Sequence, residues 1–116
     1  MNRENIEALL HRWTHEAIAG GEFEVFDELL AHDVVDESGE VPVHGTASFK
    51  ARAEAVRRAL SDLTLRIDAL IIEGDSIAWR WTLCGVTPSG ERTSVRGANF
   101  QRLKDGRVVS HWSLRS

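Results

Sequence analysis

The spacing of apolar residues changes near Ser61, and this change constrains the fold more than any other feature of the sequence. Before Ser61 the apolar residues recur every three or four positions, which is the spacing of helices that bury one face. After it they recur at every second position, which is the spacing of strands with one buried face. Helices followed by strands are typical of an α+β domain, in which helices cover one face of an antiparallel sheet.

Three helices are predicted in the first half of the chain. The first spans residues 5–19, whose apolar positions form one face, and the pair Gly20-Gly21 ends it. A second, short helix follows over residues 23–30, and residues 33–36 form a brief extended piece. The third helix spans residues 47–60, with Thr46 as its expected N-cap.

Four strands are predicted in the second half. The first begins near Leu63 and ends at a turn over residues 73–76. The following strands span residues 77–86, 93–103 and 107–114, and they are separated by turns at 87–90 and 104–106. Four consecutive strands joined by tight turns indicate an antiparallel meander.

Length, charge and cysteine content exclude several classes of protein. With 116 residues, the chain is expected to form a single domain over residues 1–116. Its one cysteine, Cys84, excludes an intramolecular disulfide. No apolar run approaches the roughly 18 residues of a membrane span, and the polar N-terminus is unlike a signal peptide. A net charge of −4 without a basic block argues against nucleic-acid binding. We therefore expect a cytoplasmic protein with neither a membrane nor a nucleic-acid partner.

Six short segments, in order and spread over nearly the whole chain, resemble the SnoaL-like polyketide cyclases, in the superfamily that also holds nuclear-transport-factor-like proteins and ketosteroid isomerase. They cover residues 20–23, 26–35, 43–45, 72–75, 79–82 and 106–112. The resemblance implies a cone, in which a curved antiparallel sheet wraps around the N-terminal helices and encloses an apolar pocket. It also implies a homodimer formed through the outer face of the sheet, and chemistry without a cofactor.

By the same resemblance, Asp36 is the candidate general base. Ketosteroid isomerase has an aspartate upstream of a Pro and a Gly, and Asp36, Pro42 and Gly45 keep that spacing. A carboxylate that removes a proton from carbon beside a carbonyl needs a dry pocket, where desolvation raises its pKa. However, residues 37–40 also read as a solvated acidic turn, so a surface position for Asp36 is the alternative.

The sequence departs from the acid–base signatures of both relatives. It contains no Tyr, so the phenol of the isomerase's oxyanion hole has no counterpart. Trp13 or Thr14 occupies that helix position, depending on where a one-residue shift is placed, and Ala98 occupies the position of the second donor. In SnoaL-like cyclases an Asp lies four residues after the Trp of the last strand, but here the position four residues after Trp112 holds Ser116.

Strand alternation suggests which residues could replace these groups. If Ala98 faces the pocket, Arg96 and Phe100 share its face. Similar matching directs three residues of the last strand inward, namely His111, Ser113 and Arg115.

His111 is the inward group suited to proton transfer near neutral pH. It could act with Asp36, or it could donate a hydrogen bond to a developing enolate while Arg96 supplies positive charge. The alternatives are a structural histidine with satisfied hydrogen bonds, and an Arg96 that forms a salt bridge at a strand end.

Trp79 and Trp81 lie two residues apart and therefore share one face of their strand. On the concave face they would line the pocket with Trp13 and Phe26 and favour a flat ligand. On the convex face they would form a dimer interface.

No metal or nucleotide site is predicted. His11 and His15 are neighbours on the first helix, but no third ligand follows at a suitable spacing. Cys84, in mid-strand, is expected to be a buried, inert thiol. A phosphate-binding Gly-rich loop of the P-loop type is missing from the sequence.

Three functions are compatible with these residues. The first is a small, cofactor-independent enzyme that cyclises, by an aldol-type reaction, or isomerises an apolar, planar carbonyl compound such as a polyketide. The second is a non-catalytic module that binds a small ligand or dimerises. The third is a limonene-type epoxide hydrolase, which needs an Asp-Arg-Asp trio that only Asp36, Arg96 and Asp68 could provide.

Overall fold

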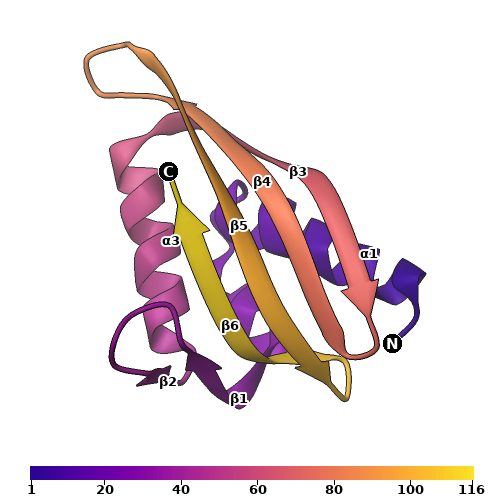
Figure 1. Ribbon diagram of the computed structural model, residues 1–116. Coiled ribbons are helices and arrows are strands. Elements are labelled where there is room, and N and C mark those ends of the chain that lie inside the picture. Colours follow the sequence, from indigo (N-terminus) through magenta and orange to yellow (C-terminus); the bar gives the residue numbers. More distant parts are fainter.

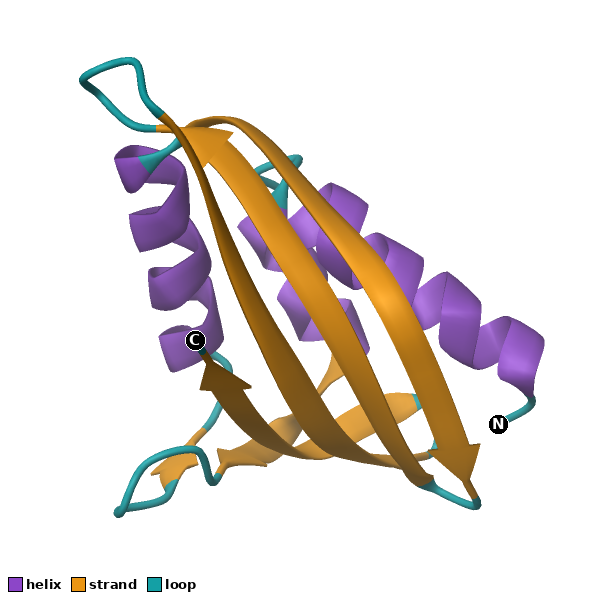
Figure 2. Cartoon of the chain, turned by 45° about the horizontal axis from the view of Figure 1, so that its top comes forward, coloured by secondary structure: helices purple, strands orange, loops and turns teal.

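The computed structural model describes residues 1–116 and places helices on the concave side of a curved, six-stranded sheet (Figures 1 and 2). The sheet order is β2-β1-β6-β5-β4-β3, and the sheet does not close into a barrel. The helices-then-sheet order predicted from the apolar spacing is confirmed.

The first predicted helix is present as two continuous segments. Helix α1 (Arg3–His11) starts at the N-cap Asn2, whose side chain accepts a hydrogen bond from the amide of Asn5. It continues as a π-helical segment, η1 (Arg12–Ile18). There the buried Thr14 hydroxyl donates to the carbonyls of Leu10 and His11, at 3.0 and 3.2 Å. Such side-chain bonds compete with the regular helical ladder.

The second helical region is shorter than predicted. It consists of a 3-10 turn, η2 (Phe23–Val25), and one turn of α-helix, α2 (Phe26–Leu29). Helix α3 (Ala47–Ala59) lies where it was expected. Thr46 is its N-cap residue, as predicted, but the Thr46 hydroxyl donates to Asp27 Oδ1 and makes no capping bond to an amide of α3.

The four predicted strands form the expected antiparallel meander. They are β3 (Ser61–Glu73), β4 (Ser76–Val86), β5 (Arg92–Lys104) and β6 (Arg107–Arg115).

The extended piece before α3 extends this sheet. Strand β1 (Leu30–Asp36) pairs in parallel with β6, and β2 (Val43–His44) pairs antiparallel with β1. The sheet is therefore mixed rather than purely antiparallel. The parallel register sets Asp36 opposite His111, which brings two predicted site residues onto adjacent strands.

The alternation predicted for β5 is wrong. Arg96, Ala98 and Phe100 lie on the outer face of the sheet and do not line the internal pocket. Phe100 is 55% exposed, and its ring packs 5.4 Å from that of Trp112.

The register with β6 explains the error. Directly opposed residues of antiparallel strands share a face, and Asn99 pairs with Ser113 while Gln101 pairs with His111. Because His111 and Ser113 lie on the concave face and line the pocket, Asn99 and Gln101 must lie on the concave face too. Placing Ala98 inward by resemblance shifted the alternation by one residue, which moves every side chain of a strand to the other face.

The core lies between the helices and the concave face of the sheet. Every helical segment and the strands β1, β4, β5 and β6 contribute side chains to one cluster of buried hydrophobic residues. No helix is both long enough and apolar enough to cross a membrane.

Truncation in this core should destabilise the fold strongly. Leu10 is fully buried on α1, so Leu10→Ala should lower the free energy of unfolding by about 2–5 kcal/mol through lost burial and the cavity that is left. Urea denaturation of the variant measures the loss. Val41 is exposed in a loop, and Val41→Ala as the control should change stability by less than about 0.5 kcal/mol. A loss below about 1 kcal/mol for Leu10→Ala would contradict the packing described.

Candidate functional site

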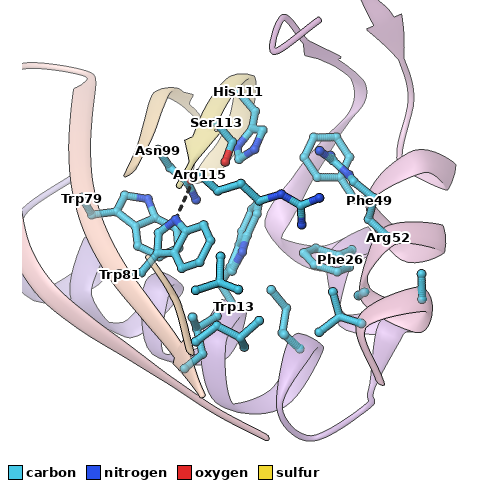
Figure 3. Close-up of a pocket in the computed structure, with 17 residues that line it drawn as sticks. Trp13, Phe26, Phe49, Arg52, Trp79, Trp81, Asn99, His111, Ser113 and Arg115 are labelled. Carbon is cyan, nitrogen blue, oxygen red and sulfur yellow. Dashed lines mark hydrogen bonds between the residues drawn. The ribbon is translucent and has the colours of Figure 1, made fainter. Parts of the chain in front are cut away.

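A pocket of about 430 Å³ lies between the helices and the concave face of the sheet, and most of its lining residues are hydrophobic (Figure 3). Its volume is in the range of sites for small organic ligands. Trp13, Phe26, Trp79 and Trp81 all contribute to the wall. The two tryptophans of β4 are therefore on the concave face.

Trp13 is the centre of the aromatic wall. Its ring meets Phe26, Phe49 and Trp79 edge-on, with centroids 5.0, 6.0 and 6.2 Å apart. It also stacks on the imidazole of His111 at 5.6 Å, with 21° between the planes. These geometries are those that aromatic pairs favour, and they hold the wall in one arrangement.

Two buried amides on β5 fix the tryptophans of β4. The indole N–H of Trp81 donates to Asn99 Oδ1, and that of Trp79 donates to Gln101 Oε1, each at 3.0 Å. Neither amide was predicted from the sequence, because the alternation of β5 was assigned to the wrong face. The register that places His111 inward would have identified them.

Trp81 lies directly over Gly97. A Cβ at Gly97 would overlap the indole ring and come within 2.7 Å of the carbonyl oxygen of Leu114. The strand therefore needs a glycine here so that the indole can lie flat against the backbone.

The amide of Gln101 also fixes the tautomer of His111. An indole N–H can only donate, so the atom of Gln101 that meets Trp79 must be the oxygen. The amide nitrogen then donates to His111 Nδ1, at 2.9 Å. Nδ1 is therefore an acceptor, and the neutral ring carries its proton on Nε2.

Burial keeps His111 neutral. Desolvation lowers the pKa of the imidazole to about 4; the nearby carboxylate of Asp36 opposes this shift, and the charge of Arg52 adds to it. His111 Nε2 makes no hydrogen bond within the protein. It is not fully buried, because the only fully buried side-chain polar atom that lacks a partner is Ser48 Oγ. The Nε2–H group therefore retains access to the pocket that His111 lines.

Asp36 is neither the exposed turn residue nor the carboxylate of raised pKa considered above. It is only 6% exposed. Its Oδ1 accepts from the amide and hydroxyl of Ser38, at 3.0 and 2.6 Å, and its Oδ2 accepts from Arg52 at 2.6 Å. Burial alone would raise the pKa of Asp36, but the bonds from Ser38 and the charge of Arg52 outweigh it and lower the pKa, and His111 adds to this lowering only when it is protonated in acid.

The Ser38 hydroxyl also ties this turn to the sheet. It accepts a hydrogen bond from the amide of Ser113 on β6, at 2.8 Å, and Ser113 lines the pocket. Asp36 itself contributes no atom to the pocket wall, whereas its partner Arg52 does. Arg52 comes from α3, and no pattern in the sequence points to it.

The other candidate groups lie elsewhere. Asp68 is held by Arg66 and Thr82 and does not line the pocket, so the acid–Arg–acid trio of an epoxide hydrolase is not assembled. The rings of His11 and His15 stack at 4.1 Å, and no group of three possible metal ligands occurs in the structure. Cys84 is a free thiol that is only partly buried.

Fold and site together define a cone-shaped α+β protein with a ligand-sized apolar pocket. A family model for SnoaL-like polyketide cyclases matches residues 8–115. The protein therefore belongs to the SnoaL-like polyketide cyclase family. No curated protein matches the chain.

Solved structures share the fold. TsrD from Streptomyces laurentii has a TM-score of 0.87 and 23% identity, and the match covers 100% of this chain and 91% of TsrD. AclR from Streptomyces galilaeus has a TM-score of 0.82 and 22% identity over 98% of this chain and 77% of AclR. Wild-type IdmH from Streptomyces antibioticus has a TM-score of 0.78 and 23% identity over 97% of this chain and 90% of IdmH.

The buried, neutral His111 should make stability depend on pH in a defined window. Its pKa is about 4 in the folded chain and about 6.5 in the unfolded chain, so the unfolded state binds the proton first. Stability should fall as the pH decreases from about 6.5 to 4, by roughly 3 kcal/mol from this group. Asp36 has a lowered pKa and should lose its contribution only at more acidic pH.

Urea unfolding between pH 7 and pH 4.5 measures this slope. His111→Gln should flatten it, whereas His32→Gln, at an exposed position, should leave it unchanged. Nitrogen-15 NMR of the imidazoles should show His111 as the Nε2–H tautomer. A titration midpoint of His111 near 6.5 would contradict the buried, neutral state.

Proposed function

We propose that the protein binds a planar, apolar compound with a 1,3-dicarbonyl unit, as polyketides have, and catalyses acid–base chemistry on it without a cofactor. Intramolecular aldol cyclisation is the leading reaction, and isomerisation uses the same groups. The observation that carries this proposal is the neutral His111, whose fixed Nε2–H group opens onto an aromatic pocket. Membership of the family supports the substrate class.

His111 serves as a hydrogen-bond donor rather than as a base. Its Nδ1 is occupied by Gln101, and its Nε2 carries the proton, so no lone pair is free to accept one. A fixed neutral donor in a largely apolar site stabilises negative charge that develops on a carbonyl oxygen. The stacking of His111 on Trp13 holds the donor beside the surface on which a planar ligand would lie.

Asp36 is the proposed base, and its lowered pKa limits the substrates it can serve. A weakly basic carboxylate removes only protons that are already acidic. The hydrogens between two carbonyl groups meet this requirement, which is why we propose a 1,3-dicarbonyl unit rather than a simple ketone. Arg52 holds Asp36 Oδ2, but half of its side chain is exposed, so it can swing aside and uncover that oxygen.

The step conserves protons and electrons. Asp36 takes a proton from the carbon between the carbonyls, the electron pair of that C–H bond becomes the C=C bond of an enolate, and the C=O π pair moves onto the carbonyl oxygen that His111 stabilises. The enolate carbon then bonds to a second carbonyl carbon of the same molecule. The oxygen of that carbonyl receives the proton back from Asp36.

A non-catalytic binding module is the second candidate function. It is favoured by the three hydrogen bonds that occupy Asp36 and by the fact that this carboxylate does not line the pocket. In that case the pocket would bind the same kind of ligand and leave it unchanged.

Deuterium exchange into an aromatic 1,3-diketone, followed by NMR, distinguishes the two candidates. Asp36→Asn should slow protein-dependent exchange by about 100-fold or more, since a positioned base contributes this much. His111→Phe should slow it by a similar factor, because the oxyanion donor is lost. Asp33→Asn, at an exposed position on the same strand, is the matched control and should retain full exchange. Binding without exchange above the buffer rate would favour the binding module, and unaltered exchange by Asp36→Asn would remove Asp36 from the mechanism.

We also propose that the protein is a homodimer that uses the outer face of the sheet. Three large apolar side chains are exposed there, Ile71, Phe100 and Leu114, and Trp112 packs against Phe100. An exposed apolar patch on a sheet face is typical of an interface between copies.

Light scattering coupled to gel filtration tests the dimer. The parent chain should run at twice the 13.0 kDa of one chain, and Phe100→Asp should shift it to the monomer. Val41→Asp, in the exposed loop between β1 and β2, should leave the mass unchanged. A monomeric parent chain would refute the proposal.

A further inference from the structure

The pocket holds more positive than negative charge. The guanidinium groups of Arg52 and Arg115 both belong to its lining, and Asp36 is the one carboxylate paired with either of them. His111 is neutral near pH 7. The two cations and one anion leave an excess of one positive charge in a chain whose net charge is −4.

Neither arginine is saturated. Arg115 forms no ion pair or hydrogen bond with any other side chain, although Figure 3 shows it extending from the end of β6 over the pocket. Arg52 has five N–H donors and uses one of its terminal nitrogens on Asp36, at 2.6 Å. Its guanidinium also lies 5.2 Å from the centroid of the Phe49 ring, which lines the pocket too.

The strand end that carries Arg115 is held in place. The backbone amide of Ser116 donates to the carbonyl of Arg96 at 2.9 Å, and Gly97 pairs with Arg115 across the sheet. The backbone that carries Arg115 is therefore fixed beside Trp81, which lies over the same glycine.

From these contacts we infer that the natural ligand is an anion, with a carboxylate attached to its planar apolar part, and that Arg115 binds this carboxylate with support from Arg52. This inference rests on the proposed function, since it assumes that the aromatic pocket takes a planar ligand. A guanidinium is a planar fork that matches a carboxylate with two parallel hydrogen bonds. The aromatic wall takes the ring system, and the carboxylate lies at the end of the pocket where β6 ends.

The experiment compares two ligands that differ only in charge, 2-naphthoate and 2-naphthamide, by isothermal titration calorimetry at low salt. The carboxylate should bind at least 10-fold more tightly than the amide. Added salt should reduce this preference, because screening weakens the ion pair. The Trp79 and Trp81 indole N–H signals in NMR should shift with either ligand, while Trp112, on the outer face, should not.

Arg115→Gln should reduce the preference for 2-naphthoate to below about 3-fold and leave 2-naphthamide binding unchanged. Arg96→Gln removes the same charge from the outer face of the neighbouring strand and is the matched control. It should retain the full preference. Retention of the preference in Arg115→Gln, or its equal loss in both variants, would overturn the role of Arg115.

The remaining outcomes separate this inference from the proposed function. Equal binding of the two ligands, with the Trp79 and Trp81 signals shifted, would overturn the anionic ligand and leave the planar pocket intact. Binding of neither ligand would overturn both. Tighter binding of 2-naphthyl phosphate than of 2-naphthoate would replace the carboxylate by a phosphate.

Discussion

The hydrogen bonds from Trp79 through Gln101 to His111 determine most of what the pocket can do. They cross three adjacent strands, so they depend on the register of β4, β5 and β6. One amide does two things, because its oxygen orients an indole and its nitrogen selects the imidazole tautomer. A network of this kind rigidifies a site when every member is satisfied. Reversing the Gln101 amide would leave both the indole and the imidazole without a partner.

The same register explains why polar and apolar groups coexist in a small cavity. The inward positions of β5 carry Asn99 and Gln101, whose polar atoms face indole N–H groups and the imidazole rather than empty space. Their desolvation is therefore offset by hydrogen bonds. Among the groups that line the pocket, unused donors remain on His111, the two arginines, the Asn99 amide nitrogen and the Ser113 hydroxyl, and these are the ones a ligand would meet.

Much of the fold could be predicted from the sequence, because the spacing of apolar residues and the presence of turn residues depend directly on local structure. The change of spacing near Ser61 gave the helices, the meander and their order. The parallel pairing of β1 with β6 could not be predicted, since strands about 75 residues apart along the chain carry no local sign of their partner. The face of β5 was wrong for a related reason, because an error of one residue in register reverses a strand without altering its pattern.

The site was predicted less completely than the fold. The sequence correctly predicted that Asp36, His111 and the aromatic residues lie close together. The chemistry of Asp36, however, depends on Ser38 and on Arg52, which lies sixteen residues away on another element. Desolvation was anticipated, whereas the partners that reverse its effect were not. Arg52 and the two buried amides are missing from the sequence-based site because only tertiary structure directs them into the pocket.

Gly97 has no Cβ, and this affects which ligands the pocket can accept. The indole of Trp81 occupies the space that a side chain at this position would take. Every substitution at this position adds volume and displaces the ring toward the cavity or out of the sheet. Position 97 can therefore change the size of ligand that the pocket accepts while leaving Asp36 and His111 in place. In the evolution of such a scaffold, this makes substrate size separable from reaction chemistry.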